Sequence, residues 1–87
     1  MIKVVMEDGR YYTRVFCDFC RKQIVDAKDG NAEHPMEGGE VFFTHKKCCW
    51  HWESANGGRA KWGTMELSAF VLRLGLNLEM EHEILEE

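Results

Sequence analysis

The sequence predicts one small α+β domain in which β-hairpins precede a short helix and a longer C-terminal helix. Aromatic and β-branched residues flank an Asp-Gly turn near the N-terminus, and apolar residues recur at helical spacing near the C-terminus. The length of 87 residues is the third observation, because a chain this short forms one domain and buries only about 60% of its unfolded surface. We therefore expect residues 1–87 to be a single domain that benefits from a cross-link.

Residues 1–16 are predicted to form the N-terminal hairpin. The run IKVVM at residues 2–6 and the run YYTRVF at residues 11–16 favour strands, and Asp8-Gly9 lies between them. An Asp-Gly pair tolerates the positive φ angles of a two-residue type I′ turn. The second strand leads directly to Cys17.

Residues 17–56 are predicted to contain further strands and the short helix. We expect a short strand at residues 24–27, a turn or polar excursion through residues 29–39, and a strand at residues 40–44. The next turn formers after Thr44 are Asn56 and Gly57. A helix is therefore expected between them, with Thr44 as its N-cap and Asn56-Gly57 as its stop.

Residues 64–87 are predicted to be helical, after a loop at residues 57–63. Thr64 can cap a helix that Gly75 ends, and Asn77 can start a last acidic turn or helix. This helix carries two apolar stripes: one contains Leu67, Phe70, Val71 and Leu74, and the other contains Met65, Ala69 and Leu72. The first stripe can pack on the hairpins. The second needs cover either from the loop and the tail or from another chain, most simply a second copy.

The formal net charge of -4 argues against nonspecific nucleic-acid binding, which usually requires a basic domain. No segment approaches the roughly 20 apolar residues that span a bilayer, and the first residues lack the apolar run of a signal peptide. We therefore expect a cytoplasmic protein. In that reducing compartment, cysteines more often bind metals or act in catalysis than form disulfides.

Three of the four cysteines and one histidine define a candidate metal site. Cys17 and Cys20 have C-x2-C spacing, and His45 and Cys48 have H-x2-C spacing. Zinc takes four thiolate or imidazole ligands in closed structural sites, and two short chelating pairs suit it. These four residues are predicted to bind one structural Zn²⁺ per chain. A thiol redox pair is less favoured, because the residues after Cys20 look extended rather than helical.

Cys49 is the alternative fourth ligand. On a helix, positions i+3 and i+4 from His45 both face the histidine, so helical spacing alone admits Cys48 and Cys49. The usual H-x2-C arrangement favours Cys48 and leaves Cys49 as a small buried residue or a free thiol. The weaker candidates are His34, which precedes a proline in a loop, His51, which lies among tryptophans, and His82, which lies in the acidic tail.

Residues 15–53 resemble the treble-clef family of zinc fingers. The motif CDFC matches a zinc knuckle, EGGEVFF matches the intervening hairpin, and HKKC matches the first turn of the ligand-bearing helix. The pattern is also similar to the first Cys3His module of a LIM domain, although the gap between the pairs is longer and no second ligand set follows. Many knuckles place glycine directly after the second cysteine, where this chain has Arg21.

The resemblance implies a recognition module, and we expect a protein-interaction function with self-association through the C-terminal helix. A closed four-ligand site leaves no position for substrate, and no G-x-S-x-G, P-loop or paired-carboxylate motif occurs, so no enzymatic activity is expected. A histidine-metal nuclease on the same scaffold would need catalytic histidines that the sequence lacks. Nucleic-acid binding remains the alternative, through Arg21-Lys22, Lys46-Lys47 and Arg59-Lys61-Trp62.

Overall fold

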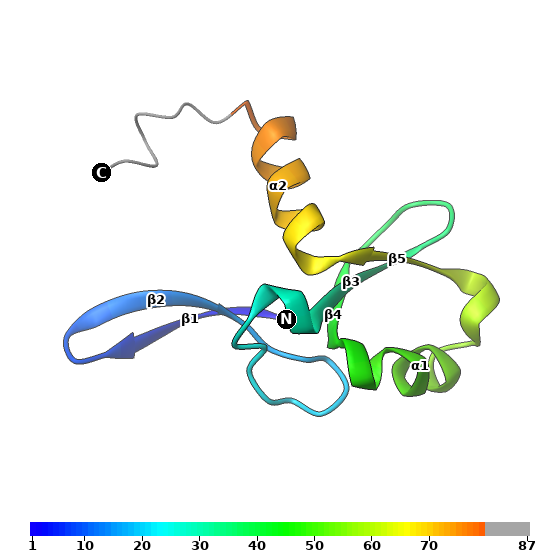
Figure 1. The fold of residues 1–87 in the computed structure, drawn as a ribbon, viewed down its shortest axis with the longest axis horizontal. Coiled ribbons are helices and arrows are strands. Elements are labelled where there is room, and N and C mark those ends of the chain that lie inside the picture. The colour runs from blue at the N-terminus through cyan, green and yellow to red at the C-terminus, as the bar shows by residue number, and fades with distance from the viewer. Residues whose placement is uncertain (80–87) are drawn as a thin grey trace.

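A computed structural model of the chain describes residues 1–79 and contains two small antiparallel sheets and two α-helices. The predicted α+β class is confirmed. In chain order the elements are β1 (Ile2–Glu7), β2 (Arg10–Val15), the 3₁₀ helix η1 (Ala27–Asp29), β3 (Gly30–Pro35), β4 (Phe42–His45), α1 (Lys46–Ala55), the 3₁₀ helix η2 (Arg59–Lys61), β5 (Trp62–Glu66) and α2 (Leu67–Asn77). Figure 1 shows the β1–β2 hairpin and α2 projecting from the part of the fold that β3, β4, β5 and α1 form.

The N-terminal hairpin is present as predicted. β1 and β2 pair in register from Ile2 opposite Val15 to Glu7 opposite Arg10. Asp8 and Gly9 have φ angles of 51° and 76°, the positive values that a type I′ turn requires. The hairpin therefore delivers the chain to Cys17, immediately after β2.

The second sheet has the strand order β4-β3-β5, with β3 in the centre. The predicted strand at residues 24–27 is wrong, since strand pairing stops at an isolated bridge between Phe16 and Gln23, just before this range, and Ala27 begins η1. The predicted polar excursion is also wrong over residues 30–35, which form β3. The polar residue Glu33 is fully buried in this strand because Thr44 and Thr64 on the flanking strands hydrogen-bond to it.

The predicted start and end of the C-terminal helix need correction. Part of the predicted loop at residues 57–63 forms η2 and the start of β5, and α2 begins at Leu67. The Thr64 hydroxyl lies against Glu33 and Glu53 instead of capping a helix. The helix also passes Gly75 and ends at Asn77. Most of the predicted acidic segment, including His82, lies outside the described residues.

The core lies where the second sheet meets the two cysteine pairs and the first turn of α2. Its buried members are Cys17, Ile24, Ala32, Phe43, Cys48 and Leu67. Phe70 adds an edge-to-face contact with Phe43 at a centroid distance of 5.5 Å. A second aromatic group, Phe42, Trp52 and Trp62, packs at the other end of α1. Two of the six buried core residues, Cys17 and Cys48, are therefore also candidate metal ligands.

Only the first part of α2 packs on the rest of the described chain. Leu67 is buried and Phe70 is half-buried, whereas Val71 and Leu74 of the same predicted stripe are exposed. Leu72, from the second stripe, is 67% exposed, and Leu76 is 70% exposed. Within residues 1–79, no helix has the length and apolarity needed to cross a membrane.

Candidate metal centre

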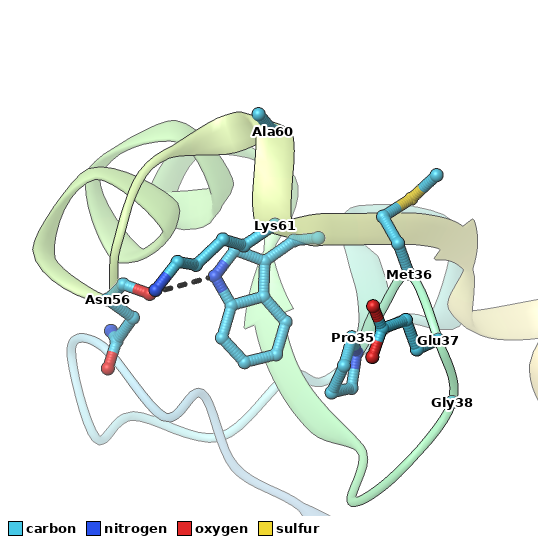
Figure 2. Close-up of a pocket in the computed structure, with 8 residues that line it drawn as sticks. Pro35, Met36, Glu37, Gly38, Asn56, Ala60 and Lys61 are labelled. Carbon is cyan, nitrogen blue, oxygen red and sulfur yellow. Dashed lines mark hydrogen bonds between the residues drawn. The ribbon is translucent and has the colours of Figure 1, made fainter.

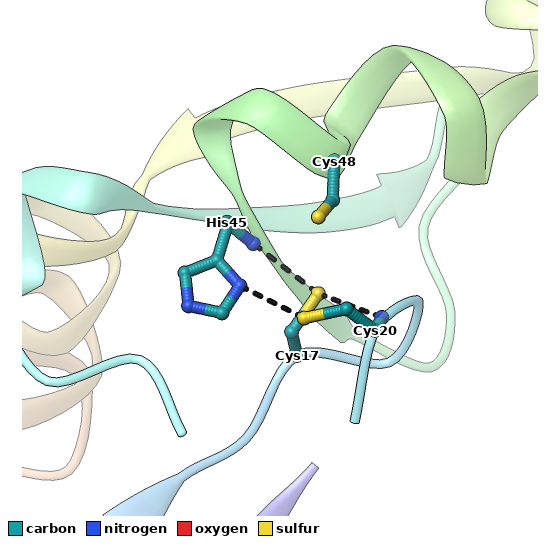
Figure 3. Close-up of side chains that lie close together, drawn as sticks. All are labelled: Cys17, Cys20, His45 and Cys48. Atoms are coloured by element: carbon teal, nitrogen blue, oxygen red, sulfur yellow. Dashed lines mark hydrogen bonds between the residues drawn. The ribbon is translucent and has the colours of Figure 1, made fainter. Parts of the chain in front are cut away.

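The four predicted ligands converge from three parts of the chain. Cys17 and Cys20 lie in the turn after β2, His45 ends β4 and is the N-cap of α1, and Cys48 lies in the first turn of that helix. One donor atom from each lies within 4.8 Å of the other three (Figure 3). All four cysteines are free thiols, so no disulfide competes for these sulfurs.

The Cys17 sulfur is prepared to carry negative charge. The backbone N–H groups of Phe19, Cys20 and His45 all point at Cys17 Sγ, each at 3.4 Å. Burial alone would raise the pKa of the Cys17 thiol, but these hydrogen bonds outweigh burial and lower its pKa to about 6. The turn between the two cysteines therefore stabilises a thiolate, the form that binds metals.

The orientation of His45 is fixed by the main chain. Its Nε2 atom lies 3.1 Å from the carbonyl oxygen of Gln23, and a carbonyl can only accept, so Nε2 carries the hydrogen. Nδ1 then presents its lone pair, and it faces Cys20 Sγ at 3.3 Å. This is the tautomer of a metal-ligating histidine whose second nitrogen is held by a backbone carbonyl.

The Cys48 side chain points toward the other three candidate ligands, as Figure 3 shows. Burial raises the pKa of its thiol to about 11, and the charge of Cys17 contributes in the same direction. A divalent cation among the sulfurs would remove that repulsion and favour the thiolate. Three sulfurs and one imidazole nitrogen at these distances fit a metal ion that prefers soft ligands in a closed, four-coordinate site.

Arg21 occupies the position where many zinc knuckles have glycine, and its backbone adopts a conformation typical of glycine. Arg21 has a φ of 69°, which is the left-handed conformation that favours glycine. Its N–H donates to the carbonyl oxygen of Cys17 at 2.9 Å and closes the turn. The turn thus keeps its shape, with a non-glycine residue held in a strained conformation.

The alternative ligands lie elsewhere. Cys49 Sγ points away from the four-residue cluster and donates to Glu33 Oε1 at 2.7 Å. His34 Nδ1 is 2.8 Å from the carbonyl oxygen of Pro35, and the His51 ring stacks on Phe19 at a centroid distance of 5.8 Å. The geometry therefore places Cys48, and none of these three residues, with Cys17, Cys20 and His45.

Sequence reasoning missed a second group of polar side chains, which lies on a neighbouring face of α1. Glu33, Cys49 and Glu53 bring one donor atom each within 4.8 Å of the others, and Thr64 hydrogen-bonds to both carboxylates. The i,i+4 spacing of Cys49 and Glu53 on a helix is the signal that was available for two of them. No comparable signal existed for Glu33, because its strand is short and polar.

A shallow groove lies at the far end of α1. It has a volume of about 520 Å³ and is lined mainly by residues of the β3–β4 turn, of η2 and of the start of β5, among them Met36, Lys61 and Trp62 (Figure 2). The Trp62 indole N–H donates to the main-chain oxygen of Asn56 at 3.0 Å, which fixes the ring along the groove. The groove lies at the C-terminal end of α1, whereas His45 and Cys48 lie at its N-terminal end.

Neither a protein-family model, nor a curated protein, nor a solved structure matches the chain. The metal centre is therefore defined by the geometry of Cys17, Cys20, His45 and Cys48 alone. These side chains form a site that can hold a metal ion.

Proposed function

We propose that this protein binds one structural Zn²⁺ per chain through Cys17, Cys20, His45 and Cys48. The observation that carries the proposal is the convergence of these four donors, with the His45 tautomer set by Gln23. Zinc is favoured over harder metals because three of the donors are thiolates. Four protein ligands leave the ion no open position, so its contribution is to stabilise the fold, and the proposal includes no catalysis.

The order of the elements supports a treble-clef-like, LIM-like module. A turn with two cysteines is followed by the β3–β4 pair and then by a helix whose start supplies the histidine and the third cysteine. A reducing compartment such as the cytoplasm would keep these thiols free to bind the metal. In this proposal the zinc positions β4 and α1 against the turn after β2.

We infer further that the protein acts as a protein-interaction module and self-associates. The supporting observation is the apolar face of α2, which we define as Val71, Leu72 and Leu76 together with Leu78, the C-cap residue, all more than half exposed. Soluble chains seldom leave so continuous an apolar helix face in water. A second copy is the partner that we propose, because a two-fold axis lets one face cover its own equivalent.

Nucleic-acid binding, the alternative function considered from the sequence, has less support than protein interaction. Of the basic residues that were candidates for a patch, Lys46 lies 3.1 Å from Glu66 and Arg59 lies 3.7 Å from Glu53. These carboxylates reduce the charge that a phosphate backbone would meet. Binding of DNA or RNA that weakens steeply with added salt would restore this alternative.

Native mass spectrometry of the full chain tests the proposed function. We expect a dimer that carries two zinc ions and that loses both on treatment with a chelator. A zinc-loaded monomer would overturn self-association and leave the metal site intact. A chain without bound zinc, even after supply of Zn²⁺ under reducing conditions, would overturn the metal proposal.

A further inference from the structure

The buried glutamates Glu33 and Glu53 lie on different elements and share one hydroxyl group. Glu33, on the central strand β3, is 0% exposed, and Glu53, on α1, is 5% exposed. The Thr64 hydroxyl, on β5, lies 3.0 Å from Glu33 Oε2 and 3.0 Å from Glu53 Oε2. These three side chains therefore join α1 to the two strands β3 and β5.

Glu33 and Glu53 have too few hydrogen-bond donors around them if both glutamates are ionised. Five contacts need a hydrogen: two from Thr64, two between Cys49 Sγ and the carboxylates, and one between Thr44 Oγ1 and Glu33 Oε1. The thiol and the two hydroxyls supply one hydrogen each, so three hydrogens face five contacts. Ionised carboxylates only accept, so two contacts would then join pairs of lone pairs, at glutamates that are themselves buried although Thr64 is exposed.

One additional proton reduces the shortage to a single contact, the 3.4 Å approach of Cys49 Sγ to Glu53 Oε2. With a proton on Glu33 Oε2, that carboxyl donates to Thr64 Oγ1, and the Thr64 hydroxyl donates to Glu53 Oε2. The Cys49 thiol remains free to donate to Glu33 Oε1 at 2.7 Å. A directed chain thus runs from Glu33 through Thr64 to an ionised Glu53, with Arg59 Nε 3.7 Å from its Oε1 atom.

We propose that Glu33 is a neutral carboxylic acid in the folded protein and that its proton clasps α1 to the second sheet through Thr64 and Glu53. We refer to Glu33, Thr64 and Glu53 as the carboxyl clasp. The clasp goes beyond the proposed zinc site, with which it shares no ligand. Because α1 carries Cys48, loss of the proton loosens the helix that supplies a metal ligand.

The charged surroundings support this assignment of the proton. Burial raises the pKa of Glu33, and the neighbouring charge of Glu53 raises it as well, against the hydrogen bonds from Cys49 and Thr64. Burial also acts to raise the pKa of Glu53, but hydrogen bonds from Glu33, Thr64 and Cys49, together with Arg59, lower it overall. Cys49, whose pKa is raised to about 12, stays protonated beside the pair. Lys46 lines the adjoining pocket, and its ammonium lies 3.1 Å from Glu66.

The proton makes stability depend on pH in a defined direction. Glu33 ionises near its ordinary pKa of 4.5 in the unfolded chain and at a higher pKa in the fold. Between these two pKa values the folded state holds one more proton, so the folding equilibrium constant falls up to tenfold for each pH unit of increase. The stabilisation is complete below the ordinary pKa and is lost as the pH rises through the folded pKa.

The test compares zinc-loaded wild type with Glu33→Gln by urea unfolding between about pH 5 and pH 8. The carboxamide keeps the shape of the neutral acid and cannot ionise, so the ratio of the two folding constants should fall as the pH rises, at up to tenfold per unit. Titrations common to both proteins cancel in the ratio. Glu37→Gln, which neutralises an exposed carboxylate, is the matched control and should give a constant ratio.

A second measurement needs no variant. Carbon NMR of side-chain carboxyls in the wild type should show one glutamate that stays protonated above the range in which the exposed glutamates titrate. A constant wild-type to Glu33→Gln ratio, or a spectrum in which no glutamate stays protonated above the range of the exposed glutamates, would overturn the clasp. A second metal ion that is bound by wild type and lost in Glu33→Gln would also overturn it. A metal ion, and not a proton on Glu33, would then neutralise the two carboxylates.

Discussion

The main-chain oxygen of Gln23 accepts a hydrogen bond from His45 Nε2 at 3.1 Å and so turns the Nδ1 lone pair toward Cys20 Sγ, 3.3 Å away. The backbone of Gln23, which is not itself a candidate ligand, thereby fixes the orientation and tautomer of the His45 ring. The histidine enters the site already in the required tautomer, which reduces the entropy lost when the metal binds. The four-residue site is therefore prearranged by the backbone as well as by its side chains.

Removal of the metal is the first prediction. Structural zinc contributes about 10–16 kcal/mol of apparent binding free energy in small domains, which matches or exceeds the whole stability of a typical fold, about 5–15 kcal/mol. We expect a strong chelator to abolish the circular dichroism signal of the folded chain, and added Zn²⁺ to restore it. A spectrum that does not change after chelation, with metal loss verified by mass, would contradict a structural role.

The two adjacent cysteines on α1 give the second prediction. Cys48 faces Cys17, Cys20 and His45, whereas Cys49 contacts Glu33. Cys48→Ser should therefore lose zinc in competition with a chelator, because removing a residue that only orients a ligand already costs about 10–100-fold in metal affinity and losing a ligand costs more. Cys49→Ser should keep one zinc per chain. Equal zinc affinities for the two variants would show that the site tolerates either cysteine.

The metal site could be predicted from the sequence because its ligands form two local pairs. C-x2-C and H-x2-C spacings bring two side chains together within one turn, so Cys17, Cys20, His45 and Cys48 could be chosen before any tertiary contact was known. The choice between Cys48 and Cys49 could not be made from helical spacing, because both face His45. The packing of α1 on the sheet separates them, since it directs Cys49 toward Glu33.

The errors in the predicted strands and helix cap have a different cause. The strand β3 has the sequence GNAEHP, in which little favours a strand. It forms because both of its neighbours pair with it and because Glu33 finds hydrogen-bond partners on β4 and α1 as well as on β5. Such long-range partners leave no periodic pattern. The same explanation applies to Thr64, which sequence reasoning assigned as a helix cap and which instead bonds to two distant carboxylates.

The strained turn after Cys20 gives the third prediction. A non-glycine residue in the left-handed region costs about 1–2 kcal/mol, and glycine loses about 0.5–1 kcal/mol in conformational entropy. Arg21→Gly should therefore stabilise the zinc-loaded protein by about 0.5–1 kcal/mol in urea unfolding. Lys22→Gly is the control, since only Asp8, Arg21 and Glu79 among the described non-glycine residues have positive φ, and it should destabilise. Lower stability for Arg21→Gly would mean that the arginine side chain itself supports the turn.

The fourth prediction concerns the apolar face of α2. Leu72 is 67% exposed and lies well away from Leu67 and Phe70, which pack on the sheet. If a second copy covers this face, burying Leu72 contributes about 1.5–3 kcal/mol in each chain, and a carboxylate placed there would have to lose its hydration. Leu72→Glu should therefore weaken the dimer at least about 100-fold, which sedimentation velocity can measure over a range of concentrations.

The control for this variant lies on the same helix. Asn77→Glu introduces the same charge at an exposed position that follows Phe70 and Leu74 at i+7 and i+3 spacing, outside the four residues of the apolar face, and should leave the dimer unchanged. Circular dichroism and zinc content should match wild type in both variants, because neither residue belongs to the core or to the metal site. If wild type sediments as a monomer at every concentration, the apolar face of α2 does not serve self-association. If both variants dissociate the dimer equally, added negative charge rather than loss of Leu72 is responsible, and the interface lies elsewhere.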